Sequence, residues 1–192
     1  MNTFFRVAVA MVGMTGLAVA QPTADPKAAA GDKAAAMPEM KPPAELAEMA
    51  KGAAGTWHCK GQGMDHTMKM VDMTATMKLK LDVANWWVHT SFESKMGKEP
   101  FQFESFMTFD AKSKTWKRVM VESGGGWSSG ESAGLKDNKV EWESTTHSAM
   151  GDGKFRDHED FSDPKAGAKM SGEFSVDGGK NWTKVYEMTC KK

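Results

Sequence analysis

The sequence predicts an all-β protein, a single antiparallel meander β-barrel of about nine to ten strands with a short N-terminal helix. From Gly55 onward apolar and polar residues alternate with a period of two, the pattern of half-buried strands. Turn residues interrupt this pattern about every 8–12 residues, a spacing typical of sandwiches and barrels. Cys59 and Cys190 stand at the two ends of the run. If they join, the first and last strands lie side by side and the sheet closes.

The N-terminus has the features of a secretory signal. Arg6 precedes an apolar stretch over 7–18, and Ala18-Val19-Ala20 forms an A-x-A cleavage site. We therefore interpret 1–20 as a signal peptide and expect a periplasmic or extracellular protein. The apolar stretch is shorter than the roughly 20 residues that a membrane span needs, and no later segment is apolar enough.

Export would place both thiols in an oxidising compartment, where a pair of cysteines usually joins. We therefore expect a Cys59–Cys190 disulfide. Two free buried thiols or two metal ligands remain the alternatives, although neither cysteine has the CxxC partner of a structural zinc site.

Composition divides the rest of the chain into two parts. Residues 21–43 are rich in Ala, Pro, Lys and Asp and contain no aromatic residue, so we predict a disordered linker. Residues 44–192 form the predicted barrel domain. Its first element is a helix over 44–52, which we expect to cover one end of the barrel.

Strands are predicted wherever the alternation runs between turn signals. For example, Val140, Trp142 and Ser144 occupy alternate positions of one predicted strand and therefore share a face. The predicted strands span 55–63, 67–82, 86–95, 101–109, 115–122, 127–134, 139–147, 154–162, 168–176 and 181–190. Two sets of residues share a face with the cysteines and are expected to point inward with them: Trp57 in the first strand, and Trp182, Tyr186 and Met188 in the last.

Short motifs in this frame resemble a bacterial family of exported barrels, domain of unknown function 1579. They are Gly55-Thr56-Trp57, Pro100-Phe101, Phe109-Asp110, Lys114-Thr115-Trp116, Glu122-Ser123-Gly124 and Asp177-Gly178 with Trp182 and Glu187. Asn85-Trp86-Trp87 stands where that family often has a Gly-Gly pair. The resemblance covers about residues 45–190 and implies a calycin-like barrel, with no established activity.

The first strand is also similar to that of nitrobindin-type haem barrels, with Cys59 in place of a glycine. The resemblance implies a haem-ligating histidine near the C-terminus. No histidine follows His158, so haem is not expected.

A barrel of about ten strands leaves an interior wide enough for a small ligand. We therefore expect a binding protein for a small apolar or amphipathic molecule, with no cofactor. The residues predicted to line the pocket are Trp57, Trp86, Phe103, Trp116 and Trp142. A filled barrel, as in a structural envelope protein, is an alternative. The 25 basic and 25 acidic residues balance and are interspersed, which argues against nucleic acid as a partner.

A methionine- and histidine-rich segment supports a second alternative, copper binding. Thioether and imidazole groups suit Cu(I). Met64, His66, Met68 and Met70 would project from one face of a strand and hold one ion. Methionine is abundant in the whole chain, however, and it also fills cores.

Three further patterns have plainer explanations than catalysis. Gly126-Trp127-Ser128-Ser129-Gly130 matches G-x-S-x-G, with His147 as a candidate base for a hydrolase, but no helix follows it. Ser175 to Trp182 matches a single Asp-box, which predicts a hairpin turn. His158-Glu159-Asp160 is interpreted as a solvated strand face. Glu93 and Glu104 could face each other across neighbouring strands as an acid/base pair, but two carboxylates on adjacent strands are usually surface groups.

Overall fold

A computed structural model describes residues 40–148 and 151–192. The predicted signal peptide and all but the last four residues of the predicted linker lie outside this part of the chain. Within it, one helix precedes ten strands: α1 (Ala44–Ala53), β1 (Gly55–Met64), β2 (Met70–Asp82), β3 (Trp87–Met96), β4 (Glu99–Asp110), β5 (Thr115–Glu122), β6 (Trp127–Ser132), β7 (Lys139–Ser148), β8 (Gly151–Asp160), β9 (Ala168–Ser175) and β10 (Thr183–Lys191).

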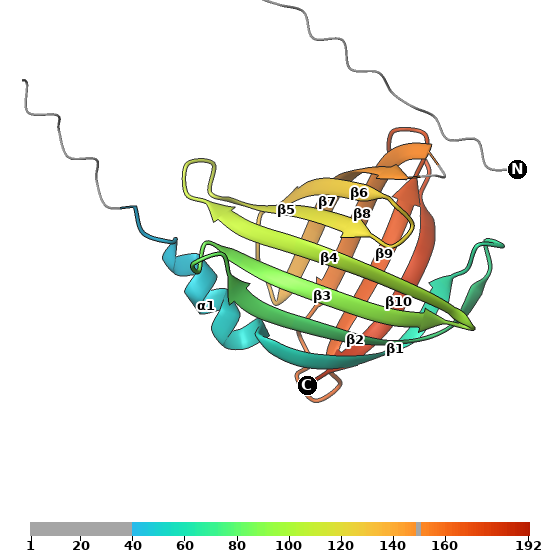
Figure 1. Cartoon of the computed structure of the whole chain (residues 1–192), viewed down its shortest axis with the longest axis horizontal. Helices are drawn as coiled ribbons and strands as arrows, with labels where there is room; N and C mark the ends of the chain where they lie inside the picture. Colours follow the sequence, from blue (N-terminus) through green and yellow to red (C-terminus); the bar gives the residue numbers. More distant parts are fainter. Residues whose placement is uncertain (1–39, 149–150) are drawn as a thin grey trace, which may run out of the picture. The chain divides into compact units, whose positions relative to one another are not determined.

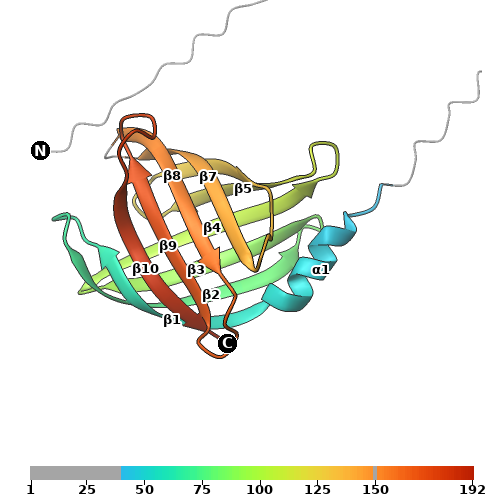
Figure 2. The ribbon, with the colours of Figure 1, turned by 180° about the vertical axis from the view of Figure 1, so that it is seen from behind.

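The ten strands form a closed barrel in which each strand pairs antiparallel with its neighbours in sequence, and β10 returns to β1. The two ends of the sheet lie side by side in both views (Figures 1 and 2). The predicted meander barrel is therefore confirmed. Most predicted strand bounds fall within two or three residues of those observed.

The seam between β1 and β10 carries the disulfide. Cys59 lies directly opposite Cys190 in the register, and their sulfur atoms are bonded. The cysteine side chains are almost fully buried, at 2% and 0% exposed. The predicted pairing is confirmed, and the seam is closed by backbone hydrogen bonds together with a covalent bond.

The helix α1 lies against one end of the barrel (Figure 1) and contacts β2, β3 and β4. It begins after Pro43, which occupies the N-cap position, and it buries Leu46 and Ala50. Trp57 at the start of β1 donates its indole N–H to the carbonyl of Ala53, 2.9 Å away. Lys192 donates to the carbonyl of Gly52 from the other side of the seam. Among the described residues no helix is long and apolar enough to cross a membrane.

The prediction that Trp182 points inward is wrong. The register between β9 and β10 shifts between Lys184 and Tyr186, so the alternation that places Tyr186 inward does not extend back to Trp182. Trp182 lies before β10, and the guanidinium of Arg156 stacks on its ring at 3.9 Å. The Asp-box folds as the predicted turn, in which Asp177 accepts hydrogen bonds from Ser175, Lys180 and Asn181.

Candidate ligand-binding interior

The interior of the barrel has two walls of different chemistry. The first, here called the apolar wall, comprises inward residues of β1, β2, β3, β9 and β10. Its buried members pack around the disulfide and are Cys59, Ala75, Met77, Phe92, Ala168, Met170 and Cys190. Phe103 of β4 extends this wall, because its ring stacks on Phe92 with centroids 4.7 Å apart. Such packing leaves little space beside the seam.

The second wall, here called the polar wall, is formed by β5 to β8. Strand β6 turns only small residues inward, namely Ser128, Gly130 and Ser132. A Cβ added to Gly130 would lie 2.1 Å from the Oγ of Ser144 on β7, so the glycine lets that hydroxyl approach the backbone. Small side chains here leave room for the larger ones that reach in from β5, β7, β8 and β10.

A network of polar side chains crosses this room. Arg118 on β5 forms a salt bridge with Asp157 on β8 through Nη2. Tyr186 on β10 donates its hydroxyl to the other Asp157 oxygen at 2.7 Å. Arg118 also lies over the ring of Trp142, with 4.5 Å between its Cζ and the ring centroid, and donates to Ser144 at 3.4 Å. Both oxygens of Asp157 are therefore already occupied.

The ionisation of these groups follows from burial and from their neighbours. Burial disfavours the charge on Arg118, but Asp157 outweighs this effect and raises the pKa of the guanidinium. Burial, together with Asp157, raises the pKa of Tyr186 well above 10.0, so its hydroxyl stays protonated. The network thus contains one buried ion pair, Arg118–Asp157, whose two charges offset each other.

Glu159 is a second carboxyl group beside this pair. Burial raises its pKa from 4.5 to about 7, and the charge of Asp157 adds to this effect. Arg118 and a hydrogen bond with the Trp142 side chain act in the opposite direction. Glu159 therefore changes charge near neutral pH, and it is the carboxylate in excess of the single guanidinium.

Several residues that point into the barrel are only half-buried. They belong mainly to β4, β5 and β8 and include Phe103, Trp116, Arg118, Phe155 and Glu159, all half-buried. In β2, by contrast, the inward residues Met73, Ala75 and Met77 are buried. The half-buried inward residues thus include Arg118 and Glu159 of the polar wall.

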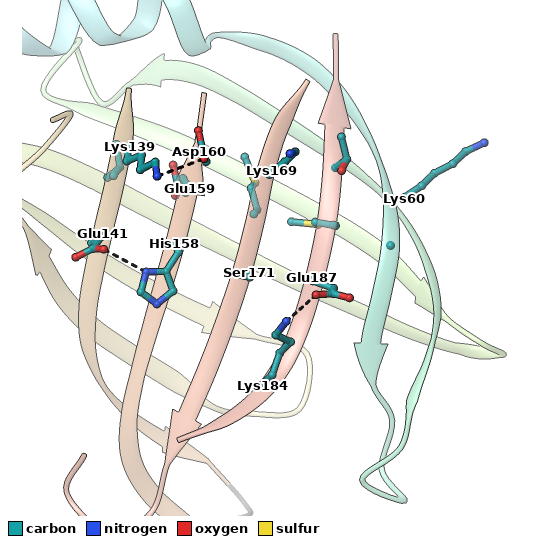
Figure 3. Close-up of a pocket in the computed structure, with 15 residues that line it drawn as sticks. Lys60, Lys139, Glu141, His158, Glu159, Asp160, Lys169, Ser171, Lys184 and Glu187 are labelled. Atoms are coloured by element: carbon teal, nitrogen blue, oxygen red, sulfur yellow. Dashed lines mark hydrogen bonds and ion pairs between the residues drawn. The ribbon is translucent and has the colours of Figure 1, made fainter. Parts of the chain in front are cut away.

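A shallow hollow of about 580 Å³ lies on the outer face. It runs across β7 to β10 and β1 and is lined mainly by charged and polar side chains (Figure 3). Three ion pairs cross it: His158–Glu141 at 3.5 Å, Lys139–Asp160 at 3.7 Å and Lys184–Glu187 at 2.7 Å. Paired, solvent-exposed charges of this kind are typical of an ordinary protein surface.

The five residues predicted to line a pocket are placed differently from one another. Trp142 is buried in the polar wall under Arg118, and Phe103 and Trp57 pack on the apolar wall. Trp116 is half-buried with its ring edge against Phe109. Trp86 precedes β3 and lies in the turn after β2. Their role in binding a ligand stays a prediction.

The predicted copper ligands do not follow one strand. Met64 ends β1 and Met70 begins β2, and the two are opposite each other in the register. His66 and Met68 belong to the turn between them, where Met68 has φ 63° and His66 pairs with Glu99. The single-face geometry is wrong because the chain turns at Asp65, which accepts hydrogen bonds from Thr67 and Lys69.

The hydrolase pair is also separated. Ser128 points inward and is 3% exposed, whereas His147 stacks on the half-exposed ring of Trp127 on the outer face. Serine and histidine therefore lie on opposite sides of the sheet. Glu93 and Glu104 face Gln102 and Ser91 rather than each other, and Glu104 pairs with His89 at 2.6 Å.

The sequence interpretation missed Arg118, Asp157 and Glu159. Glu159 was expected on a solvated face but shares the inward face of Asp157, whereas its neighbours His158 and Asp160 form ion pairs on the outer face with Glu141 and Lys139. Their positions in the strands would have identified all three residues, because residues two apart lie on the same face. Arg118 is two residues from both Trp116 and Met120, and Asp157 and Glu159 follow Phe155 by two and four residues.

The comparisons with known proteins support the fold alone. No protein-family model matches the chain, and no curated protein matches it. A crystal structure of Rv2717c from M. tuberculosis is similar, with a TM-score of 0.60 and 9% sequence identity. The match covers 77% of this chain and 96% of that chain. The fold is therefore a β-barrel shared with a distant relative in structure.

Proposed function

We propose that this protein is an exported barrel that binds a small amphipathic molecule in its interior. The observation that carries the proposal is a polar network, Arg118–Asp157–Tyr186 with Glu159, inside a barrel whose opposite wall is apolar. Small-molecule sites combine an apolar lining with a few polar groups that orient the ligand. The disulfide supports export, because such bonds persist in oxidising compartments.

A neutral fluorescent probe tests this proposal. N-phenyl-1-naphthylamine should bind the purified protein at one saturable site and brighten in the apolar interior. The variant Ser128→Phe places a ring on the inward face of β6 and should abolish the signal. Ser129→Phe is the matched control, because Ser129 is the next residue and is exposed on the outer face; this variant should bind as the wild type does.

Native mass spectrometry of the protein purified from its own cells supplies a second readout. A retained small molecule would appear as added mass and would be lost on displacement by the probe. A wild-type protein with no added mass and no saturable probe binding would contradict the proposal and favour the filled barrel of a structural envelope protein.

One observation supports a second candidate, Cu(I) binding at the β1–β2 end. The sulfur atoms of Met96 and Met73 lie 2.8 and 3.2 Å from the position that a Cβ on Gly63 would take. Two thioethers thus converge one residue from Met64, and soft sulfur ligands suit Cu(I). Cu(I) titration should shift the methyl NMR signals of these methionines before those of Met107 and Met120 in β4 and β5; simultaneous shifts or none would exclude the site.

A further inference from the structure

The chemistry of the polar wall indicates what kind of polar group a ligand would carry. The inference rests on the proposed function, since it concerns the same interior. Three side chains with full charges or potential charges meet there: Arg118, Asp157 and Glu159. Each has a different capacity to accept a new partner.

Arg118 and Asp157 have little capacity left. Asp157 accepts one hydrogen bond on each oxygen, from Arg118 and from Tyr186. The charge of Arg118 is paired with Asp157, and the face of its guanidinium is covered by the Trp142 ring. Its Nε has no partner, but it is fully buried, so a ligand cannot reach it without a rearrangement.

Glu159, unlike Arg118 and Asp157, can still accept a hydrogen bond or an ion pair from a ligand. It lies two residues after Asp157 on the same face of β8 and is half-buried. Tyr186 directs its proton to Asp157, and the residues opposite Glu159 on β7 and β9, Val140 and Met170, carry no charge. The Trp142 side chain is the hydrogen-bond partner that Glu159 has in this wall.

The charges of the wall therefore sum to zero or to minus one, depending on Glu159. An anionic ligand would meet two carboxylates and a guanidinium that is already paired, which costs desolvation without a new ion pair. A cation beside Glu159 would instead neutralise the surplus charge. An alkyl or aryl group on that cation would extend toward the methionines and aromatic rings of the apolar wall.

We propose that the polar end of the ligand is a basic amine, bound as an ammonium ion by the carboxylate of Glu159, so that the interior selects amphipathic amines over acids and alcohols of the same length. The class includes alkylamines and arylalkylamines small enough for a barrel of ten strands.

Three probes with the same ten-carbon chain separate the head groups: decylamine, decanol and decanoate. Their affinities are measured at pH 8 by displacement of N-phenyl-1-naphthylamine and by calorimetry. Decylamine should bind at least tenfold more tightly than decanol, and decanoate should bind least tightly. Between pH 6 and 8 the affinity for decylamine should rise about tenfold as Glu159 ionises, while that for decanol stays constant.

Two variants assign the selectivity to one residue. Glu159→Gln should lose at least tenfold in decylamine affinity and the pH dependence, and it should keep its affinity for decanol, which also shows that the variant folds. Glu141→Gln is the control, because Glu141 carries the same charge on the outer face of the neighbouring β7 and its side chain is 77% exposed. It should bind all three probes as the wild type does.

The outcomes separate this inference from the function on which it rests. If decanol or decanoate binds as tightly as decylamine, or if Glu159→Gln leaves the selectivity unchanged, the amine assignment is wrong while the binding function stands. If none of the three probes binds, both are wrong.

Discussion

The apolar wall and the polar wall belong to one continuous sheet, yet they stabilise the barrel in different ways. The apolar wall is packed around a disulfide with buried methionine, phenylalanine and alanine side chains. The polar wall consists of serine hydroxyls, a glycine and an ion pair. Its serines and Asp157 are buried, whereas Arg118 and Glu159 are half-buried. Burial of apolar surface dominates stability, whereas buried polar groups are costly unless they are satisfied. The difference indicates that the first wall holds the fold and the second is available for chemistry.

The largest expected effect tests the apolar wall. The variant Cys59→Ala/Cys190→Ala removes a bond between residues 131 apart, which the chain-entropy estimate values at about 4–5 kcal/mol. Urea unfolding of the variant should show that loss relative to the oxidised wild type. Reduced and oxidised wild type should differ by a similar amount. Equal midpoints for all three would show that the seam does not depend on its covalent bond.

Breaking the ion pair of the polar wall should cost nearly as much. Arg118→Met leaves Asp157 buried beside Tyr186 with no cation, a change worth about 3–5 kcal/mol. The double variant Arg118→Met/Asp157→Asn removes both charges and keeps an acceptor for Tyr186, so it should recover at least half of the loss in urea unfolding. A double variant no more stable than Arg118→Met would contradict the pairing.

The pH dependence of stability should reveal Glu159. Its pKa is raised from 4.5 to about 7 by burial, so the folded state binds the proton more tightly than the unfolded state. The free energy of unfolding should therefore fall as pH rises from 4.5 through 7, by up to about 3 kcal/mol. Glu159→Gln should flatten this profile between pH 5 and 8, whereas Glu141→Gln should retain it. An unchanged slope in Glu159→Gln would show that its carboxyl is not desolvated.

The smallest expected effects contrast one hydroxyl in each wall. Ser144→Ala removes an acceptor of Arg118 and should cost about 0.5–1.5 kcal/mol. Ala168→Ser introduces a hydroxyl into the apolar wall, where Ala168 is 3% exposed, and should cost about 1–3 kcal/mol. Thermal unfolding of the two variants should rank them in this order. The reverse order would show that the two walls do not differ in polarity as described.

The sequence predicted the apolar wall far better than the polar wall. Alternation in β2 and the two cysteines place Met77 and Cys59 inward without ambiguity, because apolar residues on one parity define the buried face. Asp157 and Glu159 follow the same parity, but acids are usually exposed, so their chemistry argues against the position that their spacing implies. Only their partners on β5 and β10 make that position favourable, and a linear pattern does not show cross-barrel partners.

Backbone irregularities account for the other differences. The register shift between Lys184 and Tyr186 leaves no composition signal, so Trp182 was assigned to the wrong face. The turn at Asp65 contains His66 and Met68, which alternation alone placed on one strand face with Met70. One extra or missing residue reverses every side chain beyond it, and so strand existence is easier to predict than the face of a residue near a strand end.

The sulfur bridge also has a mechanical consequence. When the oxidised chain is pulled by its two ends, the covalent path runs from Cys59 to Cys190 through the bridge, so the 130 residues between them cannot be extended. Stretching a single molecule would therefore extend the segment before Cys59 and the two residues after Cys190, while the intervening loop adds contour length only after reduction.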